Sequence, residues 1–400
     1  MNSAPTTDRL TGLDALRGVA VLGILMMNVQ AFAMIPQAYD YPLAHMDVSG
    51  ANLTAWSVAH TFFALKFITI FSALFGAGIV LMVGDGDTRL HFRRMRWLLL
   101  IGLIHAYVFW YGDILVSYAI MGMIVVYARN WSPGRLTLVG LLAVAATGLL
   151  IVGLMSLFQL VPGDMDPVEM GMALSQEDLS ARVAAFQASF AGHLLPNATT
   201  AIVGQIAGLL IFGGRLIGVM MLGMALFKWG FFSAGWSFAR YALTAAVALT
   251  AGLGLSWWST QHAIETQWAL DALWVGQGLN YAGSLLAALG YGAVVMMIAK
   301  LPVLGLLTKL FAATGRMAFT NYLTQTLIMT FIFVGTPGLG LFGTVERVDQ
   351  AKIVMAVWAV QLIWSPLWLS VFRFGPLEWV WRSLTYGKLQ PMLKGKVATA

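Results

Sequence analysis

Long apolar runs, separated by short polar segments, cover most of the chain. A membrane-spanning helix needs about 20 mostly apolar residues, and ten runs fit a span or a short helix paired with its neighbour. The predicted spans are 16–36, 55–83, 97–112, 114–129, 135–161, 199–227, 238–258, 278–299, 317–335 and 352–373. The third and fourth meet at Gly112 and Asp113 and predict a tight helical hairpin. The expected fold class is all-α, a polytopic helical membrane protein with about ten spans.

Composition supports this class and excludes others. Of the 400 residues, 59% are hydrophobic and 10% are charged, against roughly 45–50% and about 25% in soluble domains. A soluble globular enzyme, a disordered chain and a coiled coil are therefore excluded. The absence of cysteine excludes disulfides, zinc–thiolate sites, iron–sulfur clusters and a cysteine nucleophile. We predict no metal site and no covalently bound cofactor.

The distribution of basic residues predicts the orientation. With the N-terminus inside, nearly all of the 23 lysines and arginines fall in inner segments. The exceptions, in outer segments or within spans, are Arg17, Lys66, Arg182, Arg215, Arg347 and Lys352. The positive-inside rule then places both termini in the cytoplasm. The net charge of +6 thus reflects the orientation of the protein in the membrane. We expect the lipid bilayer as a partner, and no nucleic acid.

One long polar segment divides the chain. Residues 162–198 are acidic, carry a helical pattern and fall on the outer side, which predicts an extracytoplasmic loop with an amphipathic helix. Five predicted spans precede it in residues 1–161, and five follow in residues 199–400. The second half ends in a tail after Gly375 that is rich in aromatic and basic residues, which predicts an interfacial helix on the cytoplasmic face.

Ionisable residues inside spans are functional-site candidates because they are costly in lipid. Asp14 and Arg17 are spaced to pair on one helix face, either as a self-neutralising ion pair or as a ligand anchor. Lys66 and Arg215 lie deep in their spans, where few acids are available. We expect both to line one polar cavity that holds an anionic ligand such as a phosphate or carboxylate. Asn28 serves either as interhelical glue or as part of the site.

Histidines supply the acid–base candidates. His105 lies inside the third span among aromatic residues, and a neutral imidazole can take a proton from an attacking hydroxyl or amine. The alternative is a histidine satisfied in a helix interface. Asp113, eight residues further on, would lie about 12 Å along a continuous helix, so we expect it to line the same cavity without touching His105. His60 and His45, near the outer face, are further candidates.

Five segments carry a family resemblance: residues 9–28, 66–76, 102–113, 315–322 and 375–387. Over nearly its entire length the chain resembles the YeiB-like family of uncharacterised bacterial inner-membrane proteins. The resemblance implies a multi-pass protein of the bacterial inner membrane and includes His105. It adds Arg316 and Asn321 to the candidate substrate-binding residues.

A shorter similarity links the opening to membrane acyltransferases typified by heparan-α-glucosaminide N-acetyltransferase. The shared residues are Asp14, Arg17, Gly18 and Asn28. It implies acyl transfer from a cytoplasmic acyl-CoA, such as acetyl-CoA, to a sugar or lipid-linked acceptor at the outer face. In those enzymes a histidine after the first span acts with the asparagine. Here His45 stands at a different spacing, and Ala64 or Leu65 occupies the position of an expected acid.

Two functional hypotheses remain open at this point. In the first, the protein is an acyltransferase: Lys66, Arg215 or Arg17 meets the charge of the donor, His105 or His60 is the base, and Asn28 polarises the acyl carbonyl. In the second, a transporter or lipid-carrier-binding protein holds a phosphate head group with the same cations and uses His105 for proton coupling. The chain shows no internal repeat, which favours the enzyme. The donor, the acceptor and the oligomeric state, a homodimer included, stay open.

Overall fold

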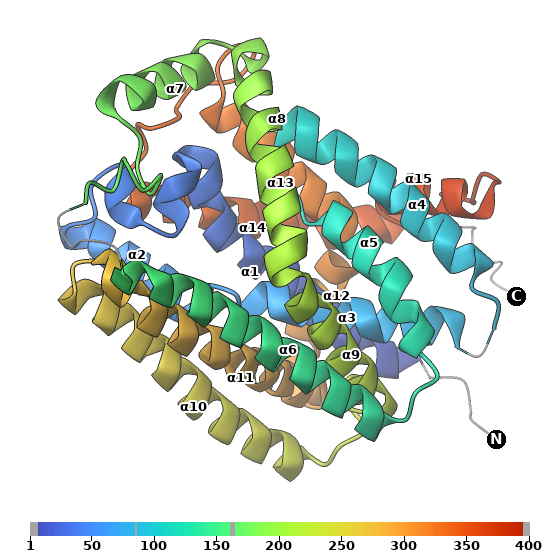
Figure 1. Ribbon diagram of the computed structural model, residues 1–400. Coiled ribbons are helices and arrows are strands. Elements are labelled where there is room, and N and C mark those ends of the chain that lie inside the picture. The colour runs from blue at the N-terminus through green and yellow to red at the C-terminus, as the bar shows by residue number, and fades with distance from the viewer. Residues whose placement is uncertain (1–6, 85, 161–164, 395–400) are drawn as a thin grey trace, which may run out of the picture.

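The computed structural model describes residues 7–84, 86–160 and 165–394. Its regular structure is helical throughout this part of the chain, apart from two isolated β-bridges (Figure 1), so the predicted all-α class is confirmed. The α-helices are α1 (Thr7–Ala33), α2 (Gly50–Phe62), α3 (Lys66–Val83), α4 (Arg89–Ile104), α5 (Leu115–Val125), α6 (Pro133–Ser156), α7 (Gln176–Ala188), α8 (Phe190–Ala207), α9 (Gly213–Lys228), α10 (Phe238–Glu265), α11 (Leu273–Ala299), α12 (Gly305–Arg316), α13 (Ala318–Phe333), α14 (Arg347–Val371) and α15 (Pro376–Tyr386). Short 3₁₀ or π segments are η1 (Pro36–Tyr39), η2 (Pro42–Ala44), η3 (His105–Phe109), η4 (Val126–Ala128), η5 (Leu157–Leu160), η6 (Gly208–Phe212), η7 (Leu270–Ala272) and η8 (Pro302–Leu304).

Several of these helices are built to cross a membrane. Among the described residues, 7 helical segments are long and apolar enough: Thr11–Ala33, Gly50–Val83, Pro133–Leu160, Phe190–Lys228, Phe238–Glu265, Leu270–Ala299 and Arg347–Val371. The other three predicted spans correspond to the shorter helices α4, α5 and α13. Leucines project outward along these helices, such as Leu138, Leu149 and Leu210, which are 61%, 75% and 76% exposed. Such surfaces suit lipid, and the protein is a helical membrane protein.

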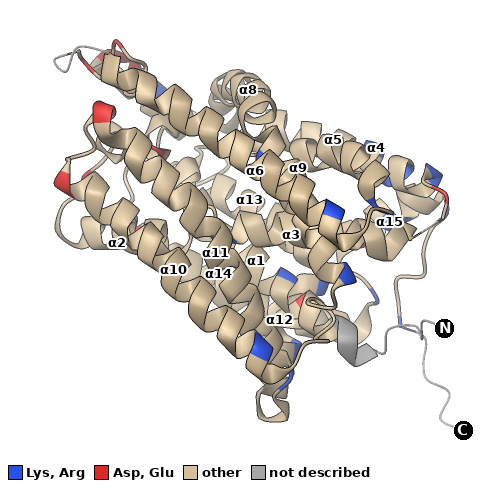
Figure 2. Cartoon of the chain, turned by 60° about the horizontal axis from the view of Figure 1, so that its bottom comes forward, with Lys and Arg blue, Asp and Glu red and all other residues tan. Residues whose placement is uncertain are grey.

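Charge divides the molecule into two ends. Most lysines and arginines lie at the end where α1 begins and α15 lies, whereas most acidic residues lie at the opposite end (Figure 2). We call these the basic end and the acidic end. This polarity agrees with the pattern read from the sequence, in which the basic end faces the cytoplasm. The assignment of each end to a compartment stays a prediction.

Helix α1 runs through the core and joins the two predicted halves of the chain. It packs on α3 from the first half and on α12, α13 and α14 from the second. Glycines permit the close contact between α1 and α12. A Cβ on Gly18 of α1 would stand 2.0 Å from the carbonyl oxygen of Phe311, and a Cβ on Gly315 of α12 would stand 1.8 Å from the carbonyl oxygen of Asp14. Small residues let membrane helices approach in this way.

The segment between the halves differs in its bounds from the prediction. Residues 161–164, where the expected loop begins, lie outside the described residues. Helix α7 follows, with Phe186 buried. The next span begins at Phe190 rather than near residue 199, so the loop is shorter than expected.

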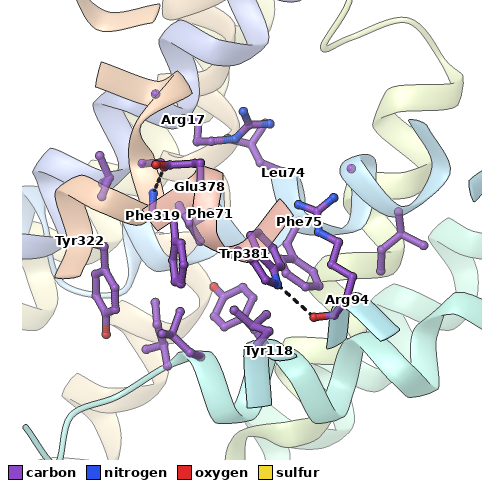
Figure 3. A pocket seen from close by; sticks show the side chains of 18 of the residues that line it. Arg17, Phe71, Leu74, Phe75, Arg94, Tyr118, Phe319, Tyr322, Glu378 and Trp381 are labelled. Carbon is purple, nitrogen blue, oxygen red and sulfur yellow. Dashed lines mark hydrogen bonds between the residues drawn. The ribbon is translucent and has the colours of Figure 1, made fainter. Parts of the chain in front are cut away.

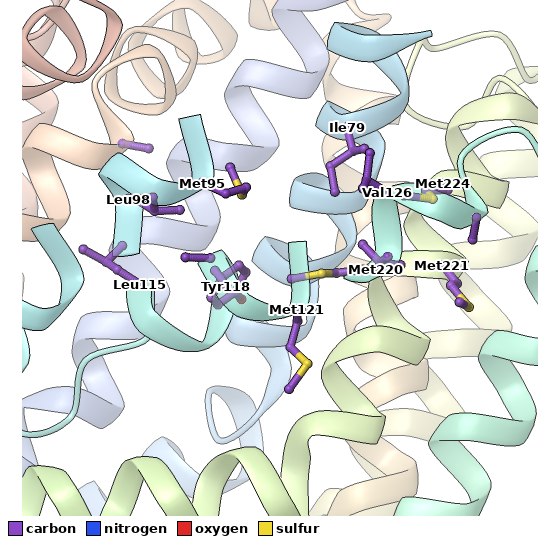
Figure 4. Packing of buried hydrophobic residues seen from close by; sticks show 14 of the residues in the cluster. Ile79, Met95, Leu98, Leu115, Tyr118, Met121, Val126, Met220, Met221 and Met224 are labelled. Atoms are coloured by element: carbon purple, nitrogen blue, oxygen red, sulfur yellow. The ribbon is translucent and has the colours of Figure 1, made fainter. Parts of the chain in front are cut away.

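Methionines fill the core between the short hairpin α4–α5 and α9. Met95, Met121, Met220 and Met224 are all buried in one cluster that also contains Tyr118 (Figure 4). The flexible methionine side chain suits such irregular gaps. This packing holds α5 against α9 and fixes the hairpin that carries the site described below.

Three membrane-depth segments depart from regular α-helix. Residues 63–65 separate α2 from α3, with Leu65 at a φ of 65°. The π segment η3 ends α4, and the π segment η6 separates α8 from α9. Irregular backbone at this depth is stable only where protein or a cavity satisfies its polar groups. Lys66, His105 and Arg215 each lie at one of these departures or within three residues of it.

Candidate functional site

The π turn at His105 brings this residue onto Asp113. The helix ends at Phe109, Trp110 is extended, and the chain then turns back on itself. The Nδ1 atom of His105 lies 2.6 Å from Oδ1 of Asp113, whose Oδ2 accepts the backbone N–H of Val116 at 2.8 Å. The expectation that the two side chains could not touch was wrong, because the helix does not continue to Asp113.

A hydroxyl completes this arrangement. Nε2 of His105 lies 2.9 Å from Oγ1 of Thr326 on α13. A carboxylate can only accept hydrogen bonds, so Nδ1 donates to Asp113 and, in the neutral ring, Nε2 accepts the hydroxyl hydrogen of Thr326. The imidazole is 3% exposed and contacts the ring of Tyr322, with centroids 5.4 Å apart. Sequence reasoning missed Thr326, although α13 carries several hydroxyl side chains in an otherwise apolar span.

A cavity of about 210 Å³ lies toward the basic end, and Figure 3 shows side chains that line it. Tyr322, Ile114 and Leu115 line it, so its wall lies directly against the residues that hold His105 and Asp113. Its charged lining residues are Arg17, Arg94, Arg316 and Glu378. We call it the basic-end cavity. Arg94, Glu378 and Trp381 were not singled out as site residues from the sequence, since they meet only through the docking of α15.

The basic-end cavity has more cationic than free anionic groups. Arg17 pairs with Asp14 at 2.7 Å, as the spacing predicted. The guanidinium of Arg94 stacks 4.1 Å over the ring of Trp381. The carboxylate of Glu378 is occupied, since it accepts the backbone N–H groups of Phe319 and Thr320 at 2.8 and 3.1 Å. Guanidinium groups in such a setting favour an anionic ligand.

A second cavity, of about 260 Å³, lies toward the acidic end. Its walls come from α2, the break after α2, the end of α10 and the start of α11. His60 lines it, donates from Nδ1 to the carbonyl oxygen of Trp56 at 3.1 Å and stacks on the Trp56 ring at 4.1 Å. We call this space the acidic-end cavity.

The two cavities approach each other along α1. Ile24 lines the basic-end cavity and Met27 lines the acidic-end cavity. The three residues from Ile24 to Met27 correspond to a rise of about 4.5 Å along the axis of α1. The ring of Phe67 lies against Gly23 at this level, where a Cβ would stand 2.3 Å from it. Asn28, next to Met27 in α1, is half-buried, and its side-chain amide makes no hydrogen bond with any described residue.

Lys66 and Arg215 do not form the shared ligand cavity expected from the sequence. Nζ of Lys66 donates to the carbonyl oxygen of His60 at 3.0 Å and to Oδ1 of Asn280 at 2.7 Å. Arg215 donates to Thr69 and Ser284 at 2.9 and 2.8 Å. Neither Lys66 nor Arg215 is among the described residues that line the two cavities. Neutral carbonyls and hydroxyls replace the missing acids as partners, and both cations are anchored on α11.

Two further candidates are embedded in the protein. The amide nitrogen of Asn321 donates to the carbonyl oxygen of Thr314 and to Oγ of Ser365, both at 3.0 Å. Nδ1 of His45 accepts the backbone N–H of Ile35 at 3.3 Å. Burial, aided by the charge of Arg347, lowers the pKa of His45 to about 4. Both contacts support a structural role.

Comparisons with known proteins give the following relatives. Residues 226–388 match a family described as "Protein of unknown function (DUF418)". The chain is 32% identical over 395 residues to the uncharacterized protein YeiB of Escherichia coli (strain K12), covering 96% of this chain and 98% of that protein. It is 31% identical over 420 residues to the uncharacterized protein YxaH of Bacillus subtilis (strain 168), covering 97% of each. No solved structure matches the chain.

Proposed function

The chain belongs to the YeiB-like family of bacterial membrane proteins, and we propose that it is an inner-membrane acyltransferase. It moves an acyl group from an anionic cytoplasmic donor, an acyl-CoA such as acetyl-CoA, to a sugar or lipid-linked acceptor at the outer face. One observation carries the proposal. Two cavities from opposite ends come within about one helical turn on α1, and the buried Asp113–His105–Thr326 chain lies behind the wall of one of them.

The donor occupies the basic-end cavity. Arg17, Arg94 and Arg316 line it and supply positive charge for phosphate groups. Only about 210 Å³ is available, which suits the acyl end of the donor and not a whole coenzyme. The nucleotide part therefore remains outside, beside the basic residues that gather at this end of the molecule (Figure 2).

The reaction assigns a role to each candidate. The acceptor hydroxyl or amine attacks the acyl carbonyl, a new ester or amide bond forms, and the thioester bond breaks. The Thr326 hydroxyl first turns away from Nε2 of His105, and this nitrogen then takes the proton of the acceptor and returns it to the departing thiolate. Asn28 donates a hydrogen bond to the carbonyl oxygen as negative charge develops there. Tyr322 stands between His105 and the cavity, so its ring moves aside during each turnover.

A transporter or lipid-carrier-binding protein is the second proposal. Discontinuous helices near the centre of the membrane are frequent in transporters, and the break between α2 and α3 is of this kind. In that case the cavities are alternately open parts of one path, His105 couples it to protons, and no covalent bond changes.

Isotopically labelled acetyl-CoA separates the two proposals. Membrane vesicles that contain the protein are incubated with acetyl-CoA labelled on its acetyl group. The release of free coenzyme A thiol and the label on membrane or sugar products are both measured. The acyltransferase proposal predicts both, in equal amounts. Acetyl-CoA that neither binds the purified protein nor loses its acetyl group in its presence overturns the proposal.

A further inference from the structure

A third cavity, which the proposed reaction does not use, lies among α3, α6, α9 and α11. Its volume is about 250 Å³, and its wall is apolar apart from Thr69, Thr137 and the indole of Trp229. The hydroxyl groups of both threonines already donate to backbone carbonyl oxygens four residues earlier in the chain. Water needs several polar partners in such a space, whereas hydrocarbon needs none. We call it the lateral cavity.

The lateral cavity has the depth of one membrane leaflet. Its lining extends from Val219 in α9 to Trp229 directly after that helix, and ten helical residues rise about 15 Å. This is half of the roughly 30 Å of a bilayer's hydrocarbon core. The shallow end is at Trp229, where α9 reaches the basic end (Figure 1). The deep end is near Thr69, one turn beyond the break between α2 and α3.

Exposed lining residues show that the lateral cavity reaches the lipid-facing side of the protein. Leu141 on α6 and Leu286 on α11 both line it and are 52% and 38% exposed. These two helices pack against each other, and apolar side chains on their outer faces meet hydrocarbon in a membrane. An acyl chain of a neighbouring lipid can therefore enter from the side without leaving an apolar environment.

Aromatic and basic side chains stand at the shallow end. Trp229 is 46% exposed, and the ammonium group of its neighbour Lys228 donates to the carbonyl oxygen of Trp131 at 2.8 Å. The guanidinium of Arg135 stacks 3.9 Å over the Trp131 ring. Arg135 is exposed and forms no ion pair with any carboxylate in the described part of the chain. Tryptophan is typical of the membrane interface, and a guanidinium there suits a phosphate group.

We propose that the lateral cavity binds one acyl chain of an anionic phospholipid from the leaflet at the basic end, with the lipid phosphate beside Arg135. The phosphate oxygens accept from the guanidinium, and Lys228 adds positive charge at the same level. The bound chain fills the space between α6, α9 and α11 and so stabilises their packing. No described residue lines both this cavity and the basic-end cavity, so the proposal does not rest on acyl transfer.

Native mass spectrometry and thermal unfolding of the full-length protein test the proposal. Detergent-solubilised protein is titrated with phosphatidylglycerol, with phosphatidylethanolamine, whose head group is neutral overall, or with inorganic phosphate. We expect one phosphatidylglycerol to stay bound and to raise the melting temperature, and phosphatidylethanolamine to bind more weakly. Equal binding of the two phospholipids would refute the anionic head group. An equal rise in melting temperature with phosphate alone would show an anion site without an acyl chain and overturn the proposal.

Substitutions that fill the lateral cavity test the position of the chain. Ala73 and Ala288 both line it, so Ala73→Leu and Ala288→Leu place three more carbon atoms where the acyl chain would lie. Each should weaken phosphatidylglycerol binding about tenfold or more. Ala246→Leu is the matched control, because Ala246 is exposed on α10. The use of two filling variants keeps the test decisive if one of them folds poorly.

A charge variant tests the position of the head group. Arg135→Gln should weaken phosphatidylglycerol binding about fivefold, the usual effect of one basic residue near an anionic lipid, and should leave phosphatidylethanolamine binding unchanged. Arg96→Gln is the matched control, since Arg96 is exposed on α4, a helix that contributes no described residue to the lining. Equal losses in both variants would attribute the effect to general surface charge and refute the head-group position.

A photoreactive lipid locates the chain without any substitution. Phosphatidylglycerol with a diazirine on one acyl chain is bound to the wild-type protein, free lipid is removed, and the sample is irradiated. We expect the adducts on lining residues such as Leu222 of α9 and Leu285 of α11. Adducts only on outward leucines such as Leu138, or filling variants that bind phosphatidylglycerol as tightly as Ala246→Leu, would refute the site.

Discussion

The imidazole of His105 and the carboxylate of Asp113 lie 2.6 Å apart within the membrane-spanning core. The contact exists because a π turn ends the helix and reverses the chain within the eight residues that separate them. It turns the other ring nitrogen toward Thr326. A carboxylate that orients a histidine toward a hydroxyl is a recurrent arrangement in acyl-transfer enzymes.

We expect His105→Gln to lower acyl transfer about 100- to 10,000-fold, the usual loss for a general acid–base group. Label transfer from acetyl-CoA in membrane vesicles measures it, normalised to folded protein. His193→Gln is the control, because His193 is equally buried but lies on α8. Full specific activity in His105→Gln with a lowered melting temperature would make His105 a packing residue and move the base to His60.

Particular residues show what the sequence could predict. Apolar runs predicted the helices, and spacing predicted the Asp14–Arg17 pair. The break at residues 63–65 was not visible, because Phe63, Ala64 and Leu65 carry no proline or glycine signal. Across this break, the Lys66 ammonium group donates to the carbonyl oxygen of His60 near the end of α2. Contacts between residues far apart in the chain, such as His105 with Thr326, leave no local pattern.

We expect Arg17→Gln and Arg94→Gln each to weaken acetyl-CoA binding about tenfold or more, because a hydrogen bond to a charged group contributes about 1.5–3 kcal/mol. Calorimetry on the purified protein gives the dissociation constants. Arg240→Gln is the matched control, since Arg240 is exposed at the basic end and stacks on Trp236 outside the cavity. An equal loss of acetyl-CoA affinity in all three variants would show that the general positive charge of the surface, and not the cavity, causes the effect.

Glu378 gives the docking of α15 a pH dependence. Burial raises the pKa of Glu378 above its usual 4.5, against the hydrogen bonds from Thr320 and the backbone. Folding therefore favours the protonated form, so this contribution to stability is complete below about pH 4.5 and is lost as pH rises through the folded pKa. The melting temperature of the wild-type protein relative to Glu378→Gln should fall across that interval. A difference that is constant with pH would contradict this.

The orientation can be tested directly. Because basic residues gather at one end (Figure 2), we expect a reporter fused at Ser180 on α7 to be extracytoplasmic and one fused after Tyr386 to be cytoplasmic. Paired reporters that are active on only one side of the membrane give the readout. A cytoplasmic signal at Ser180 would invert the two cavities, and the donor could then no longer enter from the basic end.

Lys66 was expected from the sequence to bind the donor, and its contacts predict a different outcome. Lys66→Met removes a fully buried cation and leaves the His60 carbonyl and the Asn280 amide oxygen without their donor. Leaving a buried hydrogen-bond acceptor unpaired costs about 1–3 kcal/mol, so we expect a clear fall in melting temperature. Lys352→Met, which removes an exposed pair with Asp349, should cost under about 1 kcal/mol.

A second variant distinguishes structure from ligand binding at this position. Asn280→Leu removes the other side of the same contact, so the double variant should lose less stability than the sum of the two single variants. Acetyl-CoA binding by the folded fraction of Lys66→Met should stay close to wild type, because the donor cavity is lined by other cations. An unchanged melting temperature together with lost acetyl-CoA binding would instead make Lys66 a ligand-binding residue, and the donor would then reach across the break between α2 and α3.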